Sequence, residues 1–286
     1  MIQRERVSDN VFVFQSELYA QVTAGVILGT DWAVVVDTLS YPEETLEIRD
    51  FVEQELQVPV RYVINTHYHA DHSWGSCFFP GAIVISHTLC RKLLEERGMP
   101  SLEEAQRQNS SFEKTKIVLP QMTFSEGEIS LKVDKKTITL IPLPGHSPDG
   151  IGVLNVEDRI LFASDVFMPL PYLVDGDIED MINSYKIIRK MGLENIVQGH
   201  GDVILRGEVE ETIDNHLAYL SNIRKVVRQA ARRKYAGDLL ETVDVESCGK
   251  SRVLLGGLAE DLHRRNLMVL YEQLIGEPPA FAPSEW

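Results

Sequence analysis

The chain has 286 residues, of which 44% are hydrophobic and 25% charged, a composition typical of a folded protein with enough apolar material for a sizeable core. Its formal net charge of -15 argues against a nucleic-acid partner, because nucleic-acid binding depends on an excess of Lys and Arg. The one basic stretch, at 224–234, is more typical of the solvated side of a helix. We therefore expect a small-molecule substrate and no nucleic-acid partner.

Hydropathy and cysteine content set the expected location. No run of about 18 apolar residues occurs, and residues 1–6 lead into polar sequence without an apolar leader segment. The three cysteines, Cys77, Cys90 and Cys248, are an odd number at wide spacing, which favours reduced thiols over a disulfide framework. We expect a soluble, cytoplasmic protein that makes no membrane contact. The sequence leaves the oligomeric state open, a homodimer included.

The first half of the chain alternates between short apolar runs and helical patterns. The apolar runs are broken by Gly, Thr and Asp, as in consecutive strands joined by tight turns. A helical pattern beginning at Tyr41 and Pro42 continues to Leu56, with acidic residues where a helix start tolerates them. The predicted elements, in order, are strands at 11–14, 25–28 and 33–36, a helix at 41–56, strands at 60–64 and 82–85, and helices near 87–97 and 101–116.

The second half begins with strands and becomes wholly helical. Its predicted elements are strands at 129–133, 137–143 and 159–163, a helix at 178–191, a strand at 195–197, a long helix whose apolar face runs from Ile213 to Val227, and a last helix near 258–274. This order predicts a layered α/β or α+β domain. We expect that domain to cover residues 1–234, with 235–286 as a helical C-terminal extension packed on it.

The segment His67-Tyr68-His69-Ala70-Asp71-His72 directly follows a predicted strand and holds four candidate metal ligands. In an extended chain alternate residues share a side, so His67, His69 and Asp71 can converge. His72 points in another direction, toward a neighbouring ion. A lone histidine is more often an ordinary core or surface residue, but this clustering is hard to obtain by chance. The pattern suits two adjacent metal ions better than one.

Three further candidate ligands follow predicted strands: His146, Asp165 and His200. Glycines beside His146 and His200 allow tight turns, and loops beyond strand ends are where active sites collect. Together with the first cluster this gives five imidazoles and two carboxylates without a thiolate. Such a set fits two divalent ions, zinc first, with iron or manganese as alternatives. A carboxylate placed between two ions can bridge them.

These residues, in this order, resemble the metallo-β-lactamase superfamily, whose HxHxDH signature is matched in full. The resemblance covers about residues 10–205 and implies a four-layer αββα sandwich with the metals at one edge. It implies that Asp37, at the end of an early strand, supports the site from behind the ligands. The ligand set that it implies is His67, His69 and His146 for the first metal, Asp71, His72 and His200 for the second, and Asp165 bridging both.

Because Asp165 stands at the bridging position, the ligand set is similar to that of glyoxalase II, acyl-homoserine lactonases and phosphodiesterases. True β-lactamases typically lack a bridging carboxylate. The apolar, proline-rich segment 166–172 departs from the basic, glycine-rich glutathione loop of glyoxalase II. We therefore expect a binuclear hydrolase that cleaves an ester, thioester or lactone with a metal-bridging hydroxide. Asp71 is the expected catalytic residue, orienting the nucleophile and shuttling the proton.

Tyr172 and His263 are candidate substrate-pocket residues. Tyr172 follows the bridging aspartate closely enough to stabilise an oxyanion, and His263 shares a helix face with Asn266. Ordinary packing is the favoured interpretation for both. For the whole protein the alternatives are a persulfide dioxygenase with a single iron and a phosphodiesterase. A structural metal clip fits poorly, because structural zinc sites are usually closed and rich in cysteine.

Overall fold

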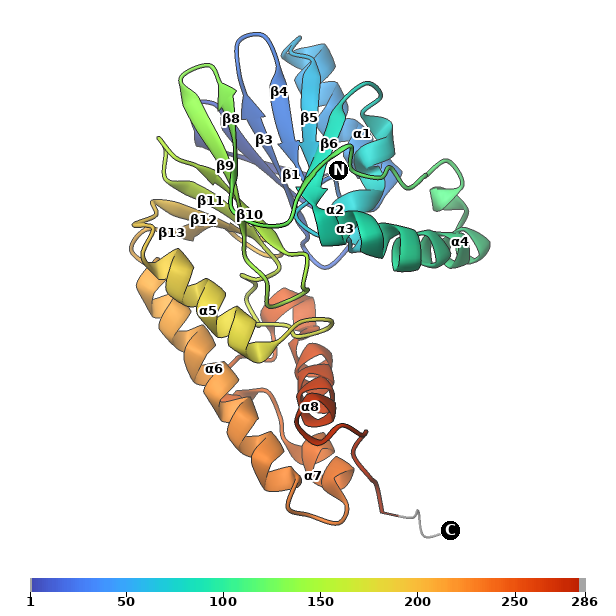
Figure 1. Cartoon of the computed structure of the whole chain (residues 1–286), viewed down its shortest axis with the longest axis vertical. Coiled ribbons are helices and arrows are strands. Elements are labelled where there is room, and N and C mark those ends of the chain that lie inside the picture. The colour runs from blue at the N-terminus through green and yellow to red at the C-terminus, as the bar shows by residue number, and fades with distance from the viewer. Residues whose placement is uncertain (1, 283–286) are drawn as a thin grey trace.

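The computed structural model describes residues 2–282, which form two mixed sheets packed face to face between helices (Figure 1). The first sheet holds seven strands in sequence order, antiparallel from β1 to β4 and parallel from β4 to β7. These strands are β1 (Gln3–Ser8), β2 (Val11–Gln15), β3 (Thr23–Leu28), β4 (Ala33–Val36), β5 (Val60–Ile64), β6 (Ile83–His87) and β7 (Met122–Phe124).

The second sheet holds six strands in the order β13-β12-β11-β10-β9-β8. Only β11 and β12 pair in parallel, and the other neighbours are antiparallel. The strands are β8 (Ile129–Val133), β9 (Lys136–Pro142), β10 (Ile151–Asn155), β11 (Ile160–Ser164), β12 (Asn195–Gln198) and β13 (Ile204–Leu205).

One hydrophobic core lies between the sheets, where alternate residues of facing strands meet. Val11 and Val13 of β2 belong to the same buried cluster as Ile138 and Leu140 of β9. At Gly25 the sheets approach so closely that an added Cβ would lie 2.1 Å from the ring of Phe162. Any larger residue at that position would push the two sheets apart.

Helices lie on the outer side of the first sheet, and the first of them pack on its outer face through Ile48, Phe51 and Val52. They are α1 (Pro42–Asp50) with the π-helical turn η1 (Phe51–Glu55), then α2 (Ala70–Ser73), η2 (Trp74–Phe78), α3 (Thr88–Leu93), η3 (Leu94–Gly98), α4 (Met99–Gln108) and η4 (Ser110–Phe112). The helix predicted at 101–116 was wrong in its extent. Asn109 leaves the helical conformation at φ -143° and its side chain accepts a hydrogen bond from the Ser111 amide, which ends α4 at Gln108.

Helices also cover the second sheet, which completes the expected αββα sandwich (Figure 1). They are α5 (Ile178–Arg189), α6 (Val209–Ala230), α7 (Ala236–Thr242), η5 (Glu246–Cys248), η6 (Leu254–Gly257) and α8 (Ala259–Ile275). All of α5 to α8 contribute to one hydrophobic cluster. The expected boundary after residue 234 falls in the turn between α6 and α7, and the division into 1–234 and 235–286 stays a prediction.

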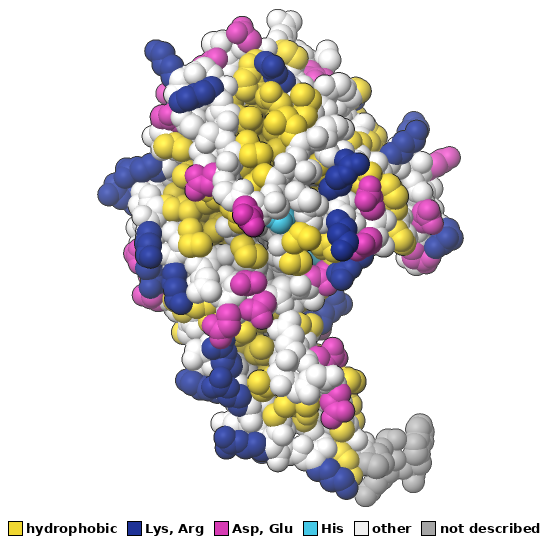
Figure 2. All heavy atoms as spheres, viewed as in Figure 1, with side chains coloured by type: hydrophobic (Ala, Val, Ile, Leu, Met, Phe, Trp, Pro, Cys, Tyr) yellow, Lys and Arg dark blue, Asp and Glu magenta, His cyan; other side chains and the backbone are white. Residues whose placement is uncertain are grey.

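The basic stretch 224–234 is the solvated side of α6 and the turn that follows it. Ile223, Val227 and Ala230 are buried, whereas Lys225 and Arg228 are exposed. Basic side chains accordingly lie along the outer edge of this part of the molecule (Figure 2). Within residues 2–282, no helix combines the length and hydrophobicity that crossing a lipid bilayer requires.

Candidate metal centre

The strand ends bring the predicted ligands to one edge of the sandwich. His67 and His69 lie in the segment after β5, and α2 begins just beyond His69. His146 lies in the loop after β9, Asp165 directly after β11, and His200 two residues after β12. In mixed α/β sheets this strand-end position is where binding crevices form, because the chain leaves the sheet there as loops.

The first group of ligand atoms is held by His67, His69, His146 and Asp165. The Nδ1 atom of His69 lies 2.9 Å from Nε2 of His67 and 3.0 Å from Nε2 of His146. Oδ2 of Asp165 lies 3.3 Å from Nε2 of His146. All of these atoms lie within 4.8 Å of one another.

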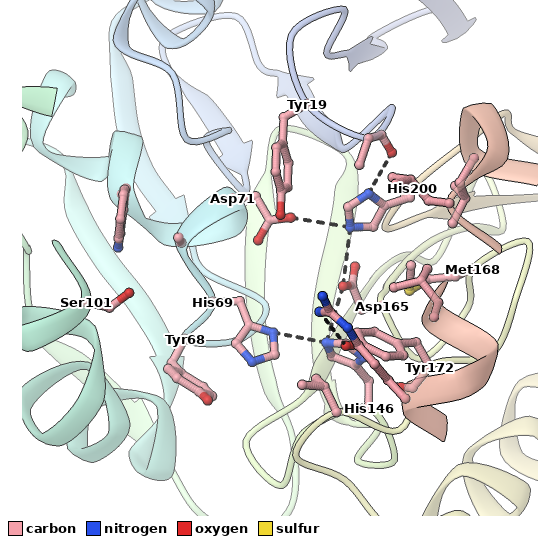
Figure 3. Close-up of a pocket in the computed structure, with 18 of the residues that line it drawn as sticks. Tyr19, Tyr68, His69, Asp71, Ser101, His146, Asp165, Met168, Tyr172 and His200 are labelled. Carbon is pink, nitrogen blue, oxygen red and sulfur yellow. Dashed lines mark hydrogen bonds and ion pairs between the residues drawn. The ribbon is translucent and has the colours of Figure 1, made fainter. Parts of the chain in front are cut away.

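The second group is held by Asp71, His72 and His200. Asp165 connects it to the first through its contacts with His200 and His146 (Figure 3). Oδ2 of Asp71 lies 3.4 Å from Nε2 of His200. Oδ2 of Asp165 lies 3.4 Å from the same nitrogen, while its Oδ1 lies 3.0 Å from Nε2 of His72. All seven residues singled out in the sequence are therefore brought together.

The outward-facing nitrogens of these imidazoles are occupied by acceptors. Nδ1 of His146 donates to the carbonyl of Tyr172 at 2.8 Å, and Nδ1 of His200 donates to the carbonyl of Ala20 at 2.9 Å. Because a carbonyl can only accept, the proton of each neutral ring lies on Nδ1 and the Nε2 lone pair faces the centre. A metal ion binds an unprotonated nitrogen, so these hydrogen bonds orient the two rings for metal binding.

Asp37 orients His72 in the same manner. Its buried carboxylate lies 2.8 Å from Nδ1 of His72 and accepts hydrogen bonds from the amide and hydroxyl of Thr66 at 2.8 and 2.7 Å. The backbone of Asp37 is left-handed, at φ 57°, a conformation that costs free energy for a residue with a side chain. The strained strand end thus aims the carboxylate at His72, in agreement with the supporting position expected for Asp37.

Asp175 supports His69 and was not found from the sequence. Its Oδ2 lies 3.3 Å from Nε2 of His69 and also accepts from the Tyr68 hydroxyl, while its Oδ1 lies 3.2 Å from the guanidinium of Arg97. A partner on Nε2 leaves Nδ1 of His69 to face the centre. No local motif marks Asp175, because it is 106 positions away from the histidine that it contacts.

Burial and neighbouring charges shift the pKa values of the titratable groups of the centre in different directions. Burial lowers the pKa of His146 to about 4. Burial also disfavours the charged form of His200, but the carboxylates of Asp165 and Asp71 outweigh it and raise the pKa of His200 to about 10. For Asp71, burial is outweighed by charged His72 and His200, and its pKa falls to about 2. The carboxylates of the centre are therefore ionised and attract positive charge.

The donor set fits divalent cations. Nε2 of His72 and Oδ1 of Asp165 are buried and lack a hydrogen-bond partner of acceptable geometry among the described residues, although they lie 3.0 Å apart. Buried polar atoms without partners are costly, and a cation bound by these donors would satisfy them. Imidazole nitrogen with carboxylate oxygen is a combination that Zn²⁺ accepts.

A pocket of about 410 Å³ opens onto this centre, and Tyr172 and Tyr19 both line it. Figure 3 shows Tyr19 beside Asp71. The charge on Asp71, followed by burial, raises the pKa of Tyr19 to about 12, so its hydroxyl stays protonated at neutral pH. On the face drawn in Figure 2, histidine atoms are visible in the middle, between hydrophobic and acidic side chains. No sequence motif marked Tyr19, which lies in the turn between β2 and β3.

His263 does not line this pocket, and its expected place there is corrected. Its side chain is fully buried, and its Nδ1 lies 3.0 Å from the hydroxyl of Tyr219 on α6. Asn266, on the same face of α8, contacts the same hydroxyl. This face packs against α6 because it carries the buried residues of α8, so a different face of the helix meets the pocket.

Comparison with known proteins gives consistent likenesses. A beta-lactamase-like protein 2 homolog of Caenorhabditis elegans is 24% identical over 172 residues, 59% of this chain and 52% of that protein. The human acyl-coenzyme A thioesterase MBLAC2 is 22% identical over 233 residues, 73% of this chain and 79% of that protein. A solved metallo-beta-lactamase from Pontibacter korlensis has a similar fold, with a TM-score of 0.61 at 19% identity over 75% of this chain and 98% of that one.

The matches cover different shares of this chain and of its relatives. The chain spans about half the length of the first curated relatives that it matches. The family model of the metallo-beta-lactamase superfamily matches residues 19–200, which is more than half of the 286 residues. That segment contains all seven predicted ligands. The chain therefore belongs to the metallo-beta-lactamase superfamily.

Proposed function

We propose that this chain is a binuclear metal-dependent hydrolase that cleaves an ester, thioester or lactone bond. The observation that carries the proposal is the position of Asp165, whose Oδ2 lies 3.3 Å from His146 in one ligand group and 3.4 Å from His200 in the other. A carboxylate shared in this way suits two neighbouring cations. The likeness to a human protein named as an acyl-coenzyme A thioesterase supports the choice of an acyl substrate.

The residues divide naturally between the two ions. Zinc is the preferred metal, because the set offers nitrogen and oxygen donors without thiolates, and iron or manganese are the alternatives. When bound, two such ions supply Lewis acidity and make a water molecule acidic enough to react near neutral pH. We assign His67, His69 and His146 to the first ion, Asp71, His72 and His200 to the second, and Asp165 to both.

The chain's own groups supply proton transfer and hydrogen bonding. Asp71 lines the pocket, so its carboxylate is placed to orient a reacting water and to receive its proton. Tyr19 and Tyr172 bring hydroxyl groups to the same pocket, and the raised pKa of Tyr19 makes it a hydrogen-bond donor. A donor beside the reacting carbonyl stabilises the charge that develops on its oxygen.

Elemental analysis and a substrate panel test this proposal. Protein purified without added metal, then loaded with zinc, is assayed with p-nitrophenyl acetate, lactones, acyl thioesters and bis-p-nitrophenyl phosphate. We expect two ions per chain and turnover of acyl substrates that a chelator abolishes. His69→Ala should lose most of this activity, whereas His87→Asn, at a histidine that caps α3 outside the centre, should retain it.

Three results would count against the proposal. Unchanged turnover after both metals are removed would exclude a metal-dependent reaction. Cleavage of the phosphodiester alone would indicate a phosphodiesterase. One iron per chain together with sulfite formation from a persulfide would indicate a dioxygenase. The expected cytoplasmic location stays a prediction.

A further inference from the structure

The pocket over the metal centre has a second wall that the proposed hydrolysis leaves without a role. This wall is formed by η6 and the first half of α8. Its contribution to the lining of the 410 Å³ pocket consists of three leucines and one arginine: Leu255, Leu258, Leu262 and Arg265.

Three of these residues, Leu258, Leu262 and Arg265, form one stripe along the start of α8, because their spacing of four and three positions places them on a single helical face. Leu255 precedes the stripe across a kink, where its backbone and that of Gly256 are left-handed. The opposite face of α8 carries the buried residues that pack into the core, among them Leu267 and Leu270. Leu258 is 42% exposed although it borders a pocket, so its side chain is free to contact a bound molecule. The leucines therefore offer an apolar surface to a molecule bound in the pocket.

Buried hydrogen bonds hold this wall in a fixed position relative to the metal centre. Asn266 is fully buried and accepts from the Leu173 amide at 2.8 Å. It also donates to the Pro171 carbonyl at 2.7 Å. Between these two hydrogen-bonded residues lies Tyr172, whose carbonyl accepts a hydrogen bond from His146. The wall and the first ligand group are therefore joined through one short loop, and the pocket between them is preorganised.

The guanidinium on this wall is exposed and forms no salt bridge within residues 2–282. Arg265 contacts the Tyr172 hydroxyl at 3.5 Å, and this contact, with the charge of Asp261 one turn earlier on α8, raises its pKa. By contrast, the neighbouring Arg264 lies 3.6 Å from Glu260. The other arginine of the pocket, Arg97, is paired with Asp175. In a chain of net charge -15, an exposed arginine at a pocket is available for an anion.

We propose that this wall selects substrates that combine an apolar chain with an anionic oxygen group, a carboxylate or a phosphate, and that Arg265 determines this specificity. The guanidinium fork matches such groups bidentately, and the leucines bury methylene groups. The proposal rests on the proposed hydrolase function, since the scissile bond would have to reach the metal centre.

Matched esters test the specificity. Zinc-loaded wild-type protein is assayed with p-nitrophenyl hexanoate and with monoesters of dicarboxylic acids from succinate to suberate, which differ from neutral esters by a terminal carboxylate. We expect Arg265→Met to lower kcat/KM for the preferred anionic ester about tenfold to a hundredfold, mainly through KM, as for the loss of a charge-assisted hydrogen bond. The neutral ester should be cleaved as before.

Arg264→Met is the matched control, because Arg264 adjoins Arg265 but does not line the pocket. It should leave both kinds of ester unaffected. Leu262→Ala should reduce the preference for hexanoate over acetate several-fold. The reason is that each substrate methylene group that is no longer buried loses about 0.8 kcal/mol of binding free energy. The proposal is overturned if Arg265→Met changes the charged and neutral esters equally, or changes neither.

A binding measurement separates this inference from the proposed function. Titration calorimetry on the zinc-loaded protein compares adipate, hexyl phosphate and 1-hexanol. We expect Arg265→Met, but not Arg264→Met, to weaken binding of an anion about tenfold while 1-hexanol is unaffected, and the better anion identifies carboxylate or phosphate recognition. If no ester is cleaved but this loss is seen, the hydrolase fails and the inference survives. Equal binding of the anions to both variants overturns it.

Discussion

Asp175 lies 3.3 Å from Nε2 of His69, and this contact leaves Nδ1 of His69 turned toward His67 and His146. A metal-binding histidine whose second nitrogen bonds a carboxylate keeps one tautomer and one ring orientation. We therefore predict that Asp175→Asn weakens metal binding about tenfold to a hundredfold, as measured by competition with a chromophoric chelator.

The neighbouring Asp177 provides the control for that variant. It caps α5 through the Glu179 and Asp180 amides, a task that asparagine performs equally well. Asp177→Asn should therefore leave metal affinity unaltered. Equal affinity in the Asp175→Asn and wild-type proteins would show that Asp175 has no part in positioning His69.

Gly199 is required by the position of Asp165. A Cβ added to Gly199 would lie 1.9 Å from Oδ1 of Asp165, closer than any real contact. We predict that Gly199→Ala displaces the carboxylate, lowers the number of metal ions bound per chain and lowers the melting temperature. Gly207 has no atom within 4 Å of its added Cβ, so Gly207→Ala is the control and should match the wild type in both measurements. Full metal occupancy in Gly199→Ala would contradict the shared position of Asp165.

Asp37 should act through the tautomer of His72. In Asp37→Asn the amide can present a donor to Nδ1 of His72, which would then accept and shift the ring proton to Nε2, the atom that faces Asp165. We predict that the ion held by Asp71, His72 and His200 binds about tenfold to a hundredfold more weakly, while the other ion is retained. Stepwise metal titration distinguishes the two. Equal weakening of both ions would show that Asp37 supports the whole edge and not His72 in particular.

The residues that the sequence revealed share a local signal. His67, His69, Asp71 and His72 lie within six positions, and His146 and His200 stand beside glycines at strand ends. Asp175 and Arg265 carry no such mark, because they acquire their roles from partners about a hundred positions away, His69 and Tyr172. Arg265 meets Tyr172 where the loop after β11 packs against α8, and Asp175 meets His69 where the same loop approaches the segment after β5.

The fold shows the same division between local and distant causes. Apolar strands such as β4 and β5 were predicted from their composition, whereas β1 was missed because its residues are charged and exposed at the sheet edge. His263 was placed in the pocket because helical spacing identifies residues on one face without saying what that face meets. In α8 the buried face meets α6, and the leucine stripe meets the pocket.

His216 makes stability depend on pH from a position outside the metal centre. Its ring lies on α6 between Phe167 and Tyr185, at centroid distances of 4.8 and 5.4 Å, and neither nitrogen has a hydrogen-bond partner within the described residues. Burial, and then the charge of Lys250, hold its pKa well below the usual 6.5. Below about pH 6.5, His216 is therefore protonated in the unfolded chain but stays neutral in the folded chain.

The stabilising effect of neutral His216 is thus fully present above its unfolded pKa and is lost as the pH falls below that value. Between about pH 7.5 and pH 5.5 this group alone should lower the free energy of unfolding by on the order of 1 kcal/mol. We predict that urea titrations of metal-free His216→Leu show an acid-induced loss smaller than that of metal-free wild type by this amount. Between about pH 7.5 and pH 8.5 the two proteins should respond alike, since the imidazole is neutral in both states. Parallel losses on the acid side would mean that His216 is protonated in the folded protein, in conflict with its burial among aromatic rings.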